Sequence, residues 1–278
     1  MSADPFLSAA LRHWGARAVP FHEHPEQTPF LTPAWEQALA LLNQTAALRS
    51  VMLLSGDNGV GKSALAAYWL KGLEPKLYLP LVITQATLSA TGLLSVLLHK
   101  LGQRATLYRS RNLASLEAAL RELGRITPVL VLDEAQQYPP GALEEVRLLL
   151  GLNLSCPPIF ALVLLGDLYL RDTLRLQHHR ALYSRIAMQC QLPSLDRTQV
   201  EPYLAHDLRQ VGLERSAFSA TALELLAGAS EGNPRLLNLL ARPAWLAAAA
   251  SGANTIGPEH VQKALELVPA VRDKINPS

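Results

Sequence analysis

Hydrophobic positions divide the chain into two regions of different character. Between residues 32 and 192, apolar runs of strand length alternate with stretches in which apolar residues recur every three or four positions, as on one helix face. Strands that alternate with helices indicate an α/β fold, in which helices cover both faces of a parallel sheet. The predicted strands are 51–55, 77–84, 129–132, 159–165 and 186–192.

The second region begins after Pro193 and contains helical patterns without a strand between them. We therefore place a domain boundary between Pro193 and Ser194. The sequence predicts an arm at 1–19, an α/β domain at 20–193 and a small all-helical domain at 194–278. The amphipathic part of the arm could dock on a neighbour or fray. The expected helices are 33–48, 64–73, 88–101, 113–124 and 141–150 in the first domain and 200–212, 219–229, 235–250 and 258–268 in the second.

A glycine-rich loop joins the first predicted strand to the next helix. Its sequence, GDNGVGKS at 56–63, fits the phosphate-binding pattern G-x-x-x-x-G-K-[ST] in full. Glycines let backbone N–H groups surround phosphates, and the following helix presents its positive end to them. Lys62 would neutralise the β- and γ-phosphates of ATP, and Ser63 would offer a hydroxyl to Mg²⁺; the alternative is a loop that no longer binds. The predicted nucleotide-binding residues are Gly56, Asp57, Asn58, Gly59, Val60, Gly61, Lys62, Ser63 and Ala64.

An acidic pair ends the third predicted strand, about 70 residues further on. In a P-loop fold this strand end is expected beside the first. Asp133 would hold Mg²⁺ through water, and Glu134 would polarise the attacking water as general base. Alone, an apolar run followed by two acids is a weak signal, because many helices begin with acids. After a complete phosphate-binding loop it predicts nucleotide hydrolysis.

Composition excludes several other classes of protein. The 278 residues are 49% hydrophobic and 17% charged, which excludes a disordered chain, and two cysteines make no disulfide framework. The uncharged stretches 77–99, 148–166 and 243–258 are interrupted by proline, glycine or serine, so we expect no membrane span. The N-terminus lacks the pattern of a signal peptide, and a cytoplasmic protein is expected. A net charge of +2 is compatible with nucleic acid but is no argument for it.

These motifs, followed by a helical domain, resemble the AAA+ ATPases, and in particular the TnsC, TniB, MuB and ExeA group. That group contains ATPases of DNA transposition and secretion-associated relatives. The resemblance covers residues 20–268 and includes, in this order, Thr32-Pro33, Asp133–Gln136, Leu165-Gly166, Ser184–Ile186 and Gly232–Asn238.

The resemblance implies further roles. Arg235 matches an arginine that faces the γ-phosphate from the helical domain, and a surface arginine is the alternative. Arg185 matches the arginine finger, which reaches the nucleotide of a neighbouring subunit. The alternative is that Arg185 forms an ion pair within its own chain, and Arg180 is a second candidate for the finger. Asp167 stands where the family usually carries a neutral polar residue. Because an acid there would repel a γ-phosphate, hydrolysis is expected to be slow.

Two basic clusters are candidates for contacts with DNA. The first lies between two predicted helices and consists of Lys100, Arg104, Arg109 and Arg111, with Tyr108 among them. The second consists of Arg171, Arg175, His178, His179 and Arg180. Cations repeated by each subunit of a ring would add their phosphate contacts. A solvated surface is the alternative for both.

The resemblance implies ATP- and Mg²⁺-dependent assembly of a homo-oligomeric ring or filament on double-stranded DNA. The expected role is regulation of transposition, with a transposase and a target-selector protein as partners. The alternatives are an ExeA-type secretion accessory and a scaffold that binds ATP and hardly hydrolyses it. No membrane partner is expected.

Overall fold

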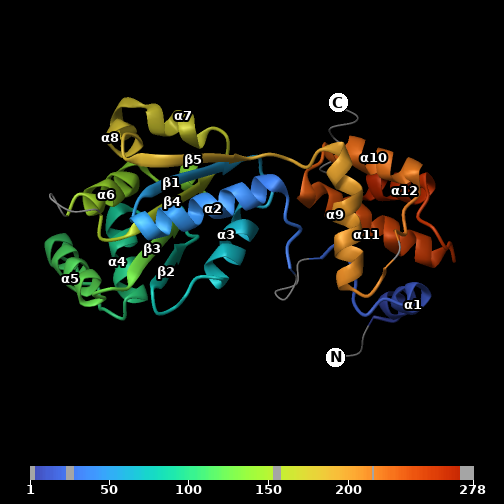
Figure 1. Ribbon diagram of the computed structural model, residues 1–278, viewed down its shortest axis with the longest axis horizontal. Helices are drawn as coiled ribbons and strands as arrows, with labels where there is room; N and C mark the ends of the chain where they lie inside the picture. Colours follow the sequence, from blue (N-terminus) through green and yellow to red (C-terminus); the bar gives the residue numbers. More distant parts are fainter. Residues whose placement is uncertain (1–3, 23–27, 153–157, 215, 270–278) are drawn as a thin grey trace. The chain divides into compact units, whose positions relative to one another are not determined.

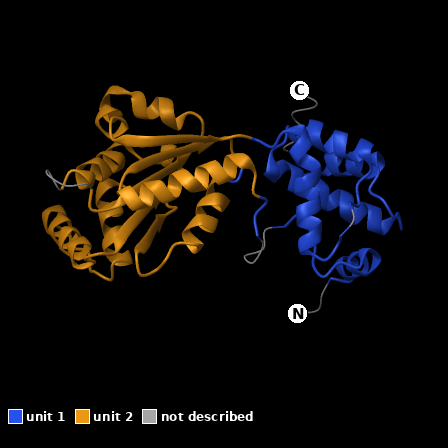
Figure 2. Ribbon diagram, in the orientation of Figure 1, with its two compact units in different colours: residues 1–30, 59–61, 194–278 blue, residues 31–58, 62–193 orange. Residues whose placement is uncertain are grey.

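The computed structural model describes residues 4–22, 28–152, 158–214 and 216–269 (Figure 1). The chain forms two compact units, which Figure 2 shows in different colours. The sheet unit comprises residues 31–58 and 62–193, and the helical unit comprises residues 1–30, 59–61 and 194–278. Residues 1–30 therefore group with the helical unit, whereas the sequence placed 1–19 in a separate arm and 20–30 in the α/β domain. Within the described ranges, no helix has both the length and the apolar character needed to cross a membrane.

The sheet unit is built on a five-stranded parallel sheet. The strands run in the order β2-β3-β4-β1-β5, and every neighbouring pair is parallel. This arrangement confirms the predicted α/β class, and each strand overlaps a predicted one. The strand bounds are β1 (Val51–Gly56), β2 (Tyr78–Ile83), β3 (Thr127–Leu132), β4 (Ala161–Gly166) and β5 (Ile186–Leu192).

Helices cover both faces of this sheet. On one face, α2 contacts β1, β4 and β5, and α3 contacts β1 and β4. Thr32 begins α2 as predicted: its hydroxyl accepts the Trp35 N–H at 3.2 Å, and Pro33 is the first helical residue. On the other face, helices including α4 and α6 pack over the sheet in one cluster. The helix bounds are α2 (Pro33–Leu48), α3 (Lys62–Lys71), α4 (Ala90–Lys100), α5 (Arg109–Glu122), α6 (Pro140–Leu150), α7 (Leu170–Arg175) and α8 (Arg180–Tyr183).

Two helix boundaries differ from the prediction in ways that affect candidate residues, and two short helices were not predicted. Helix α3 begins at Lys62, two residues earlier than predicted. Helix α5 begins at Arg109 rather than at residue 113, so Arg109 and Arg111 lie on its first turn and not in a loop. The short helices α7 and α8 were not predicted, because six and four residues are too few to show a helical period.

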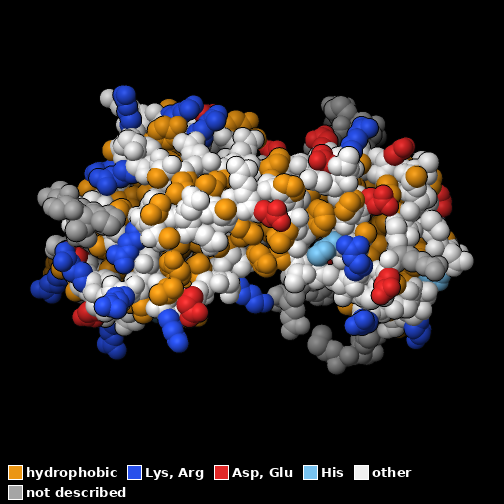
Figure 3. Space-filling view, in the orientation of Figure 1, with side chains coloured by type: hydrophobic (Ala, Val, Ile, Leu, Met, Phe, Trp, Pro, Cys, Tyr) orange, Lys and Arg blue, Asp and Glu red, His pale blue; other side chains and the backbone are white. Residues whose placement is uncertain are grey.

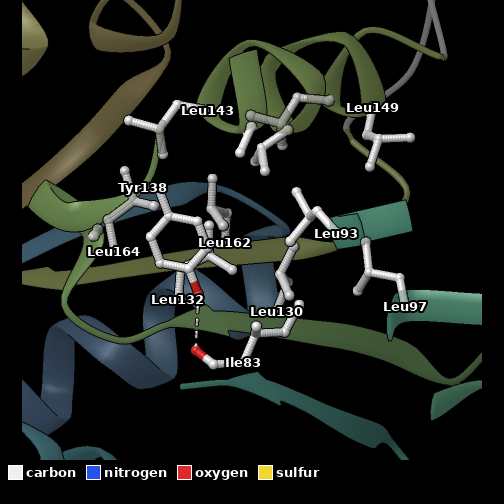
Figure 4. Close-up of a cluster of buried hydrophobic side chains, with 14 of the residues drawn as sticks. Ile83, Leu93, Leu97, Leu130, Leu132, Tyr138, Leu143, Leu149, Leu162 and Leu164 are labelled. Carbon is white, nitrogen blue, oxygen red and sulfur yellow. Dashed lines mark hydrogen bonds between the residues drawn. The ribbon is translucent and has the colours of Figure 1, made fainter. Parts of the chain in front are cut away.

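The larger hydrophobic core lies between the sheet and α4, α5 and α6. Its leucines come from the strands and from the inner faces of these helices, and Figure 4 shows some from β3, β4, α4 and α6 together with Tyr138. The Tyr138 hydroxyl donates to the Ile83 carbonyl oxygen at 3.2 Å, so the segment after β3 is fastened to the end of β2. Burial, with a contribution from Asp133, raises the pKa of Tyr138 to about 12, so this hydroxyl remains a hydrogen-bond donor well into the alkaline range.

The helical unit has a core of its own. Helix α11 contributes its apolar face, including the fully buried Trp245, and contacts α10 and α12. The arm forms α1 (Pro5–Trp14), which packs on α11: the Trp14 ring stacks on Trp245 at 6.0 Å, and Trp14 Nε1 donates to the Trp245 carbonyl oxygen at 3.2 Å. The arm is therefore docked within its own chain. After Pro193, the helix bounds of this unit are α9 (Arg197–Gln210), α10 (Ala220–Ser230), α11 (Pro234–Ala250) and α12 (Pro258–Leu267).

Candidate nucleotide-binding site

Parallel pairing brings the carboxyl ends of β1, β3 and β4 to one edge of the sheet. The glycine-rich loop follows β1, Asp133 and Glu134 follow β3, and Asp167 follows β4. The sequence predicted that the acidic strand end would lie beside the first strand; in the sheet both strands end at this edge, with β4 between them. Ligand sites in open α/β sheets lie outside the carboxyl ends of the strands, and the loop, the acidic pair and Asp167 lie at this edge. Arg185 precedes β5 and therefore lies at the opposite edge of the sheet.

The loop after β1 has the backbone that its glycines allow. Gly59 and Gly61 have φ angles of +92° and +100°, which residues other than glycine rarely adopt. The Lys62 side chain turns back along this loop, and its Nζ donates to the carbonyl oxygens of Gly56 at 2.9 Å and Asp57 at 3.0 Å. The loop therefore holds an ammonium group at the start of α3, where helix N–H groups have no acceptors in a preceding turn.

Four carboxylates contribute to the electrostatic environment of Lys62. The residue is 5% exposed, and burial lowers its pKa. The negative charges of Glu134, Asp133, Asp167 and Asp57 oppose this shift, in decreasing order. Three of these acids follow β3 and β4. The tertiary structure therefore brings acids from two neighbouring strand ends near Lys62, the lysine of the predicted phosphate-binding loop.

The backbone at the end of β3 is held at several points. The Asp133 N–H donates to the Ile83 carbonyl oxygen at 3.0 Å, the same oxygen that accepts the Tyr138 hydroxyl. The Asp133 carboxylate accepts the N–H of Glu134 at 2.9 Å. Glu134 itself has a φ of +51°, a left-handed conformation that costs a non-glycine residue on the order of 1 kcal/mol. The surrounding bonds therefore maintain a strained backbone at the candidate general base.

These residues fit ATP and Mg²⁺ by their chemistry. A buried ammonium group on a glycine-rich loop before a helix suits the phosphates. The exposed Ser63 hydroxyl and the Asp133 carboxylate, which is partly exposed, are the oxygen ligands that Mg²⁺ takes. In phosphate sites Mg²⁺ usually has one or two protein carboxylates and completes its shell with phosphate oxygens and water.

Asp167 departs from the expected neutral residue, and the structure shows what its carboxylate does. Oδ1 accepts the N–H groups of Tyr169 and Leu170, both at 3.0 Å, and so closes the turn that leads into α7. Leu170 is fully buried, so this turn anchors α7 in the core. The acid has a structural task, and its negative charge also opposes the lowering of the Lys62 pKa by burial.

Sequence reasoning did not assign a role to Gln136, which lies in the 3₁₀ turn η1 (Ala135–Gln137). Its Nε2 donates to Glu134 Oε2 at 2.7 Å, and its Oε1 accepts the Asp167 N–H at 3.3 Å. One amide thus joins the segments that follow β3 and β4. The sequence does place Gln136 two positions after the candidate base, at the end of the motif Asp133–Gln136. Its contact to the distant Asp167 cannot be seen in the sequence.

The two candidate arginines lie on different units. Arg235 is exposed on the first turn of α11, after Gly232, whose φ is +70°. A Cβ at Gly232 would overlap the Leu195 carbonyl oxygen, so glycine is required at this turn. Arg185 is exposed at the start of β5, and its Nη1 donates to the Leu150 carbonyl oxygen at 3.4 Å. A cation there suits the negative end of α6.

The first basic cluster lies around the start of α5, and Figure 3 shows Lys and Arg side chains gathered over the end of the sheet unit that carries this helix. Lys100, Arg104 and Arg111 are exposed. Arg111 lies over the Tyr108 ring at 5.0 Å. Arg109 differs, because its guanidinium makes three hydrogen bonds of 2.8–3.1 Å to the carboxylate of Glu145, which is 3% exposed. The structure therefore gives Arg109 a partner that neutralises its charge.

In the second basic cluster, several side chains already have partners or are buried. Arg171 and Arg175 lie 3.6 and 3.7 Å from the Asp172 carboxylate, and Arg175 Nε also donates to the Tyr183 hydroxyl at 3.1 Å. His179 is buried, and burial lowers its pKa. Among the described residues, the first cluster thus has more exposed cations without a carboxylate partner than the second.

A parallel sheet with a phosphate-binding loop after β1, an acidic pair after β3 and a polar turn after β4 is the arrangement of an α/β P-loop fold of the AAA type. Residues 46–174 match the family of AAA domains. The chain is also 30% identical over 233 residues to general secretion pathway protein A of Aeromonas hydrophila, a match that covers 80% of this chain and 41% of that protein. The chain therefore spans about two fifths of this curated relative.

Solved structures share this fold. Cdc6p from Pyrobaculum aerophilum superimposes with a TM-score of 0.70 at 22% identity, over 88% of this chain and 70% of that one. The ORC1 protein of Aeropyrum pernix in complex with DNA gives a TM-score of 0.68 at 21% identity, over 90% of this chain and 69% of that one. At these identities the likeness shows the fold.

Proposed function

We propose that this protein binds ATP with Mg²⁺ and hydrolyses it to ADP and phosphate. The observation that carries the proposal is the placement of Lys62, which the loop carbonyls hold beside Asp133 and Glu134 at one edge of the sheet. Ser63 would hold Mg²⁺ directly and Asp133 would hold it through water, and the ion would supply positive charge that polarises the phosphates. Glu134 would accept a proton from the attacking water, and Lys62 would neutralise charge on the phosphate oxygens.

The proposal extends to two arginines. Arg235 would contact the γ-phosphate from the helical unit, and Arg185 would act on the nucleotide of a neighbouring subunit. Both assignments rest on the resemblance of their sequence motifs. Exposure of the Arg185 side chain, with a single long hydrogen bond to a carbonyl oxygen, is compatible with release toward another subunit. Hydrolysis would then depend on assembly of a homo-oligomeric ring or filament.

Replacing Arg185 by alanine tests action between subunits. We expect ATP affinity of the monomer to change less than twofold and hydrolysis to fall by about 10³-fold or more, as for loss of other arginine fingers. The decisive measurement mixes Arg185→Ala with Lys62→Ala subunits, because an interface can then combine an intact loop from one with an intact arginine from the other. Recovery of hydrolysis supports the finger. A mixture that stays inactive while both variants are folded and assembled contradicts it.

We further propose that the assembled protein binds double-stranded DNA through Lys100, Arg104 and Arg111. The exposed cations at the start of α5 support this, together with the DNA complex of the structurally similar ORC1 protein. Phosphate contacts are sequence-tolerant and weaken with salt. Because Arg109 already pairs with buried Glu145, it is left out of the phosphate contacts that the sequence assigned to it.

DNA binding is predicted to depend steeply on salt and on ATP. If each subunit neutralises about two phosphates, log affinity per subunit should fall with log salt at a slope of roughly −2. Replacing Lys100 and Arg104 by alanine should flatten this slope and leave basal ATP hydrolysis unchanged. The matched control, Lys71→Ala with Lys76→Ala, removes the same charge from exposed positions elsewhere. An equal loss of binding in both pairs would show a general charge effect, and an unchanged slope would assign the contact to another surface.

The biological role that we propose is regulation of transposition in the cytoplasm, with a transposase and a target-selector protein as partners. The 30% identity to general secretion pathway protein A favours a second role, as an accessory ATPase of secretion. Duplex DNA separates the two, because only the first role requires it to stimulate hydrolysis and assembly. Electron microscopy with ATP and duplex DNA would show rings or filaments on the DNA in the first case.

A further inference from the structure

We propose that Gln136 is the positioning residue of the candidate general base: it holds the Glu134 carboxylate and joins it to the turn after β4. This inference rests on the proposed ATP hydrolysis and adds a residue with no other assigned role. The amide uses both of its ends. Nε2 donates to Glu134 Oε2 at 2.7 Å, and Oε1 accepts the Asp167 N–H at 3.3 Å.

The chemistry of the two partners determines the orientation of this amide. A carboxylate only accepts hydrogen bonds and a backbone N–H only donates, so the NH₂ group must face Glu134 and the oxygen must face Asp167. The reversed orientation would place oxygen against oxygen and N–H against N–H. A glutamine therefore suits this position, whereas glutamate would lose the donor and an aliphatic residue would lose both bonds.

The far end of the bridge is itself held in place. The Asp167 carboxylate closes the turn through the N–H groups of Tyr169 and Leu170 at 3.0 Å, and Leu170 is fully buried. Gly166 leaves the space that the amide occupies, because a Cβ there would lie 2.7 Å from Gln136 Oε1. Gln136 therefore ties Glu134 to a turn anchored in the core.

Glu134 needs such a support. It lies on a left-handed backbone with a φ of +51°, just before the short turn that carries Gln136, and its side chain is partly exposed. A flexible carboxylate there could adopt several rotamers, and only some would face the attacking water. The bond at Oε2 restricts these rotamers while Oε1 remains for the water. Misplacement of a general base lowers the rate of the chemical step without a matching loss of substrate binding.

Steady-state ATP hydrolysis by Gln136→Ala tests the proposal. We expect kcat to fall by about 10- to 100-fold, the factor that corresponds to one hydrogen bond to a charged group, while KM and ATP affinity change less than twofold. Gln136→Met, which keeps the length and bulk of the side chain, should lose a similar factor. The matched control is Gln137→Ala, an exposed glutamine in the same turn, which should hydrolyse ATP as the wild type does.

A double-mutant cycle separates positioning from a general structural effect. In the Glu134→Gln background, Gln136→Ala should lower the single-turnover rate by less than twofold, because no base remains to be positioned. Additive losses would overturn the proposal, as would a Gln136→Met variant with wild-type kcat. A wild type that binds ATP without hydrolysing it would overturn the proposed function and this inference together. Wild-type hydrolysis combined with an unimpaired Gln136→Ala variant overturns this inference alone.

Discussion

Replacing Lys62 by alanine is expected to lower ATP affinity by about 100-fold or more. The ammonium group is the cation that would contact the phosphates in the proposed site, and hydrogen bonds to charged groups contribute about 1.5–3 kcal/mol each. Lys62 Nζ donates hydrogen bonds to the carbonyl oxygens of Gly56 and Asp57, at 2.9 and 3.0 Å. It can exchange these carbonyl oxygens for phosphate oxygens by side-chain rotation. Its removal would leave Asp133, Glu134 and Asp167 to repel the nucleotide without a neutralising charge.

Isothermal titration calorimetry with an ATP analogue in the presence of Mg²⁺ measures this loss. The control is Lys71→Ala, which removes the same side chain from the exposed end of the same helix. Thermal melts of both variants establish that they are folded. If Lys62→Ala binds nucleotide as tightly as the control does, the loop after β1 is not the phosphate site.

Replacing Glu134 by glutamine is expected to lower turnover by a factor on the order of 10²–10⁴, the usual range for loss of a general base. Glutamine has the size of glutamate and tolerates the same backbone, but its amide does not take a proton from water at neutral pH. ATP binding should persist, because one negative charge near the phosphates is removed. The variant should therefore accumulate in the ATP-bound, assembled state.

Single-turnover hydrolysis measures the chemical step for this variant, and sedimentation with ATP measures its assembly. Glu122→Gln, at the exposed end of α5, is the matched control and should retain wild-type turnover. Turnover by Glu134→Gln at the wild-type rate would show that another group accepts the proton, and the proposed role of Gln136 would fail with it.

Much of the sheet unit could be predicted because its signals are local. Strands buried on both faces appear as continuous apolar runs, and the phosphate-binding loop is a contiguous motif whose glycines determine its backbone. Helix α2 began where predicted, because Thr32 and Pro33 specify a helix start by themselves. The early start of α3 at Lys62 also has a local cause, since the loop ends at Gly61 with a φ of +100°.

Other features were missed because their determinants lie far apart in the chain. Arg109 looks like an exposed cation, yet it pairs with Glu145, 36 residues later. The arm looks like a separate segment, yet Trp14 stacks on Trp245 in α11. Such contacts depend on which helix faces pack together, and a single sequence does not specify that packing.

The sequence by itself determined the class of the candidate site: a loop of glycines with a lysine suited to phosphates, and an acidic pair at a strand end suited to Mg²⁺ and water. Residue type and short spacing are sufficient for this, because the chemistry lies within contiguous segments. The tertiary structure alone decided how these segments cooperate. Strand order placed β4 between β3 and β1, and only then could Gln136 reach from the Glu134 carboxylate to the Asp167 N–H. Hydrogen bonds act over about 3 Å in space, whatever the separation along the chain, so the partners of a site residue depend on the packing of the sheet.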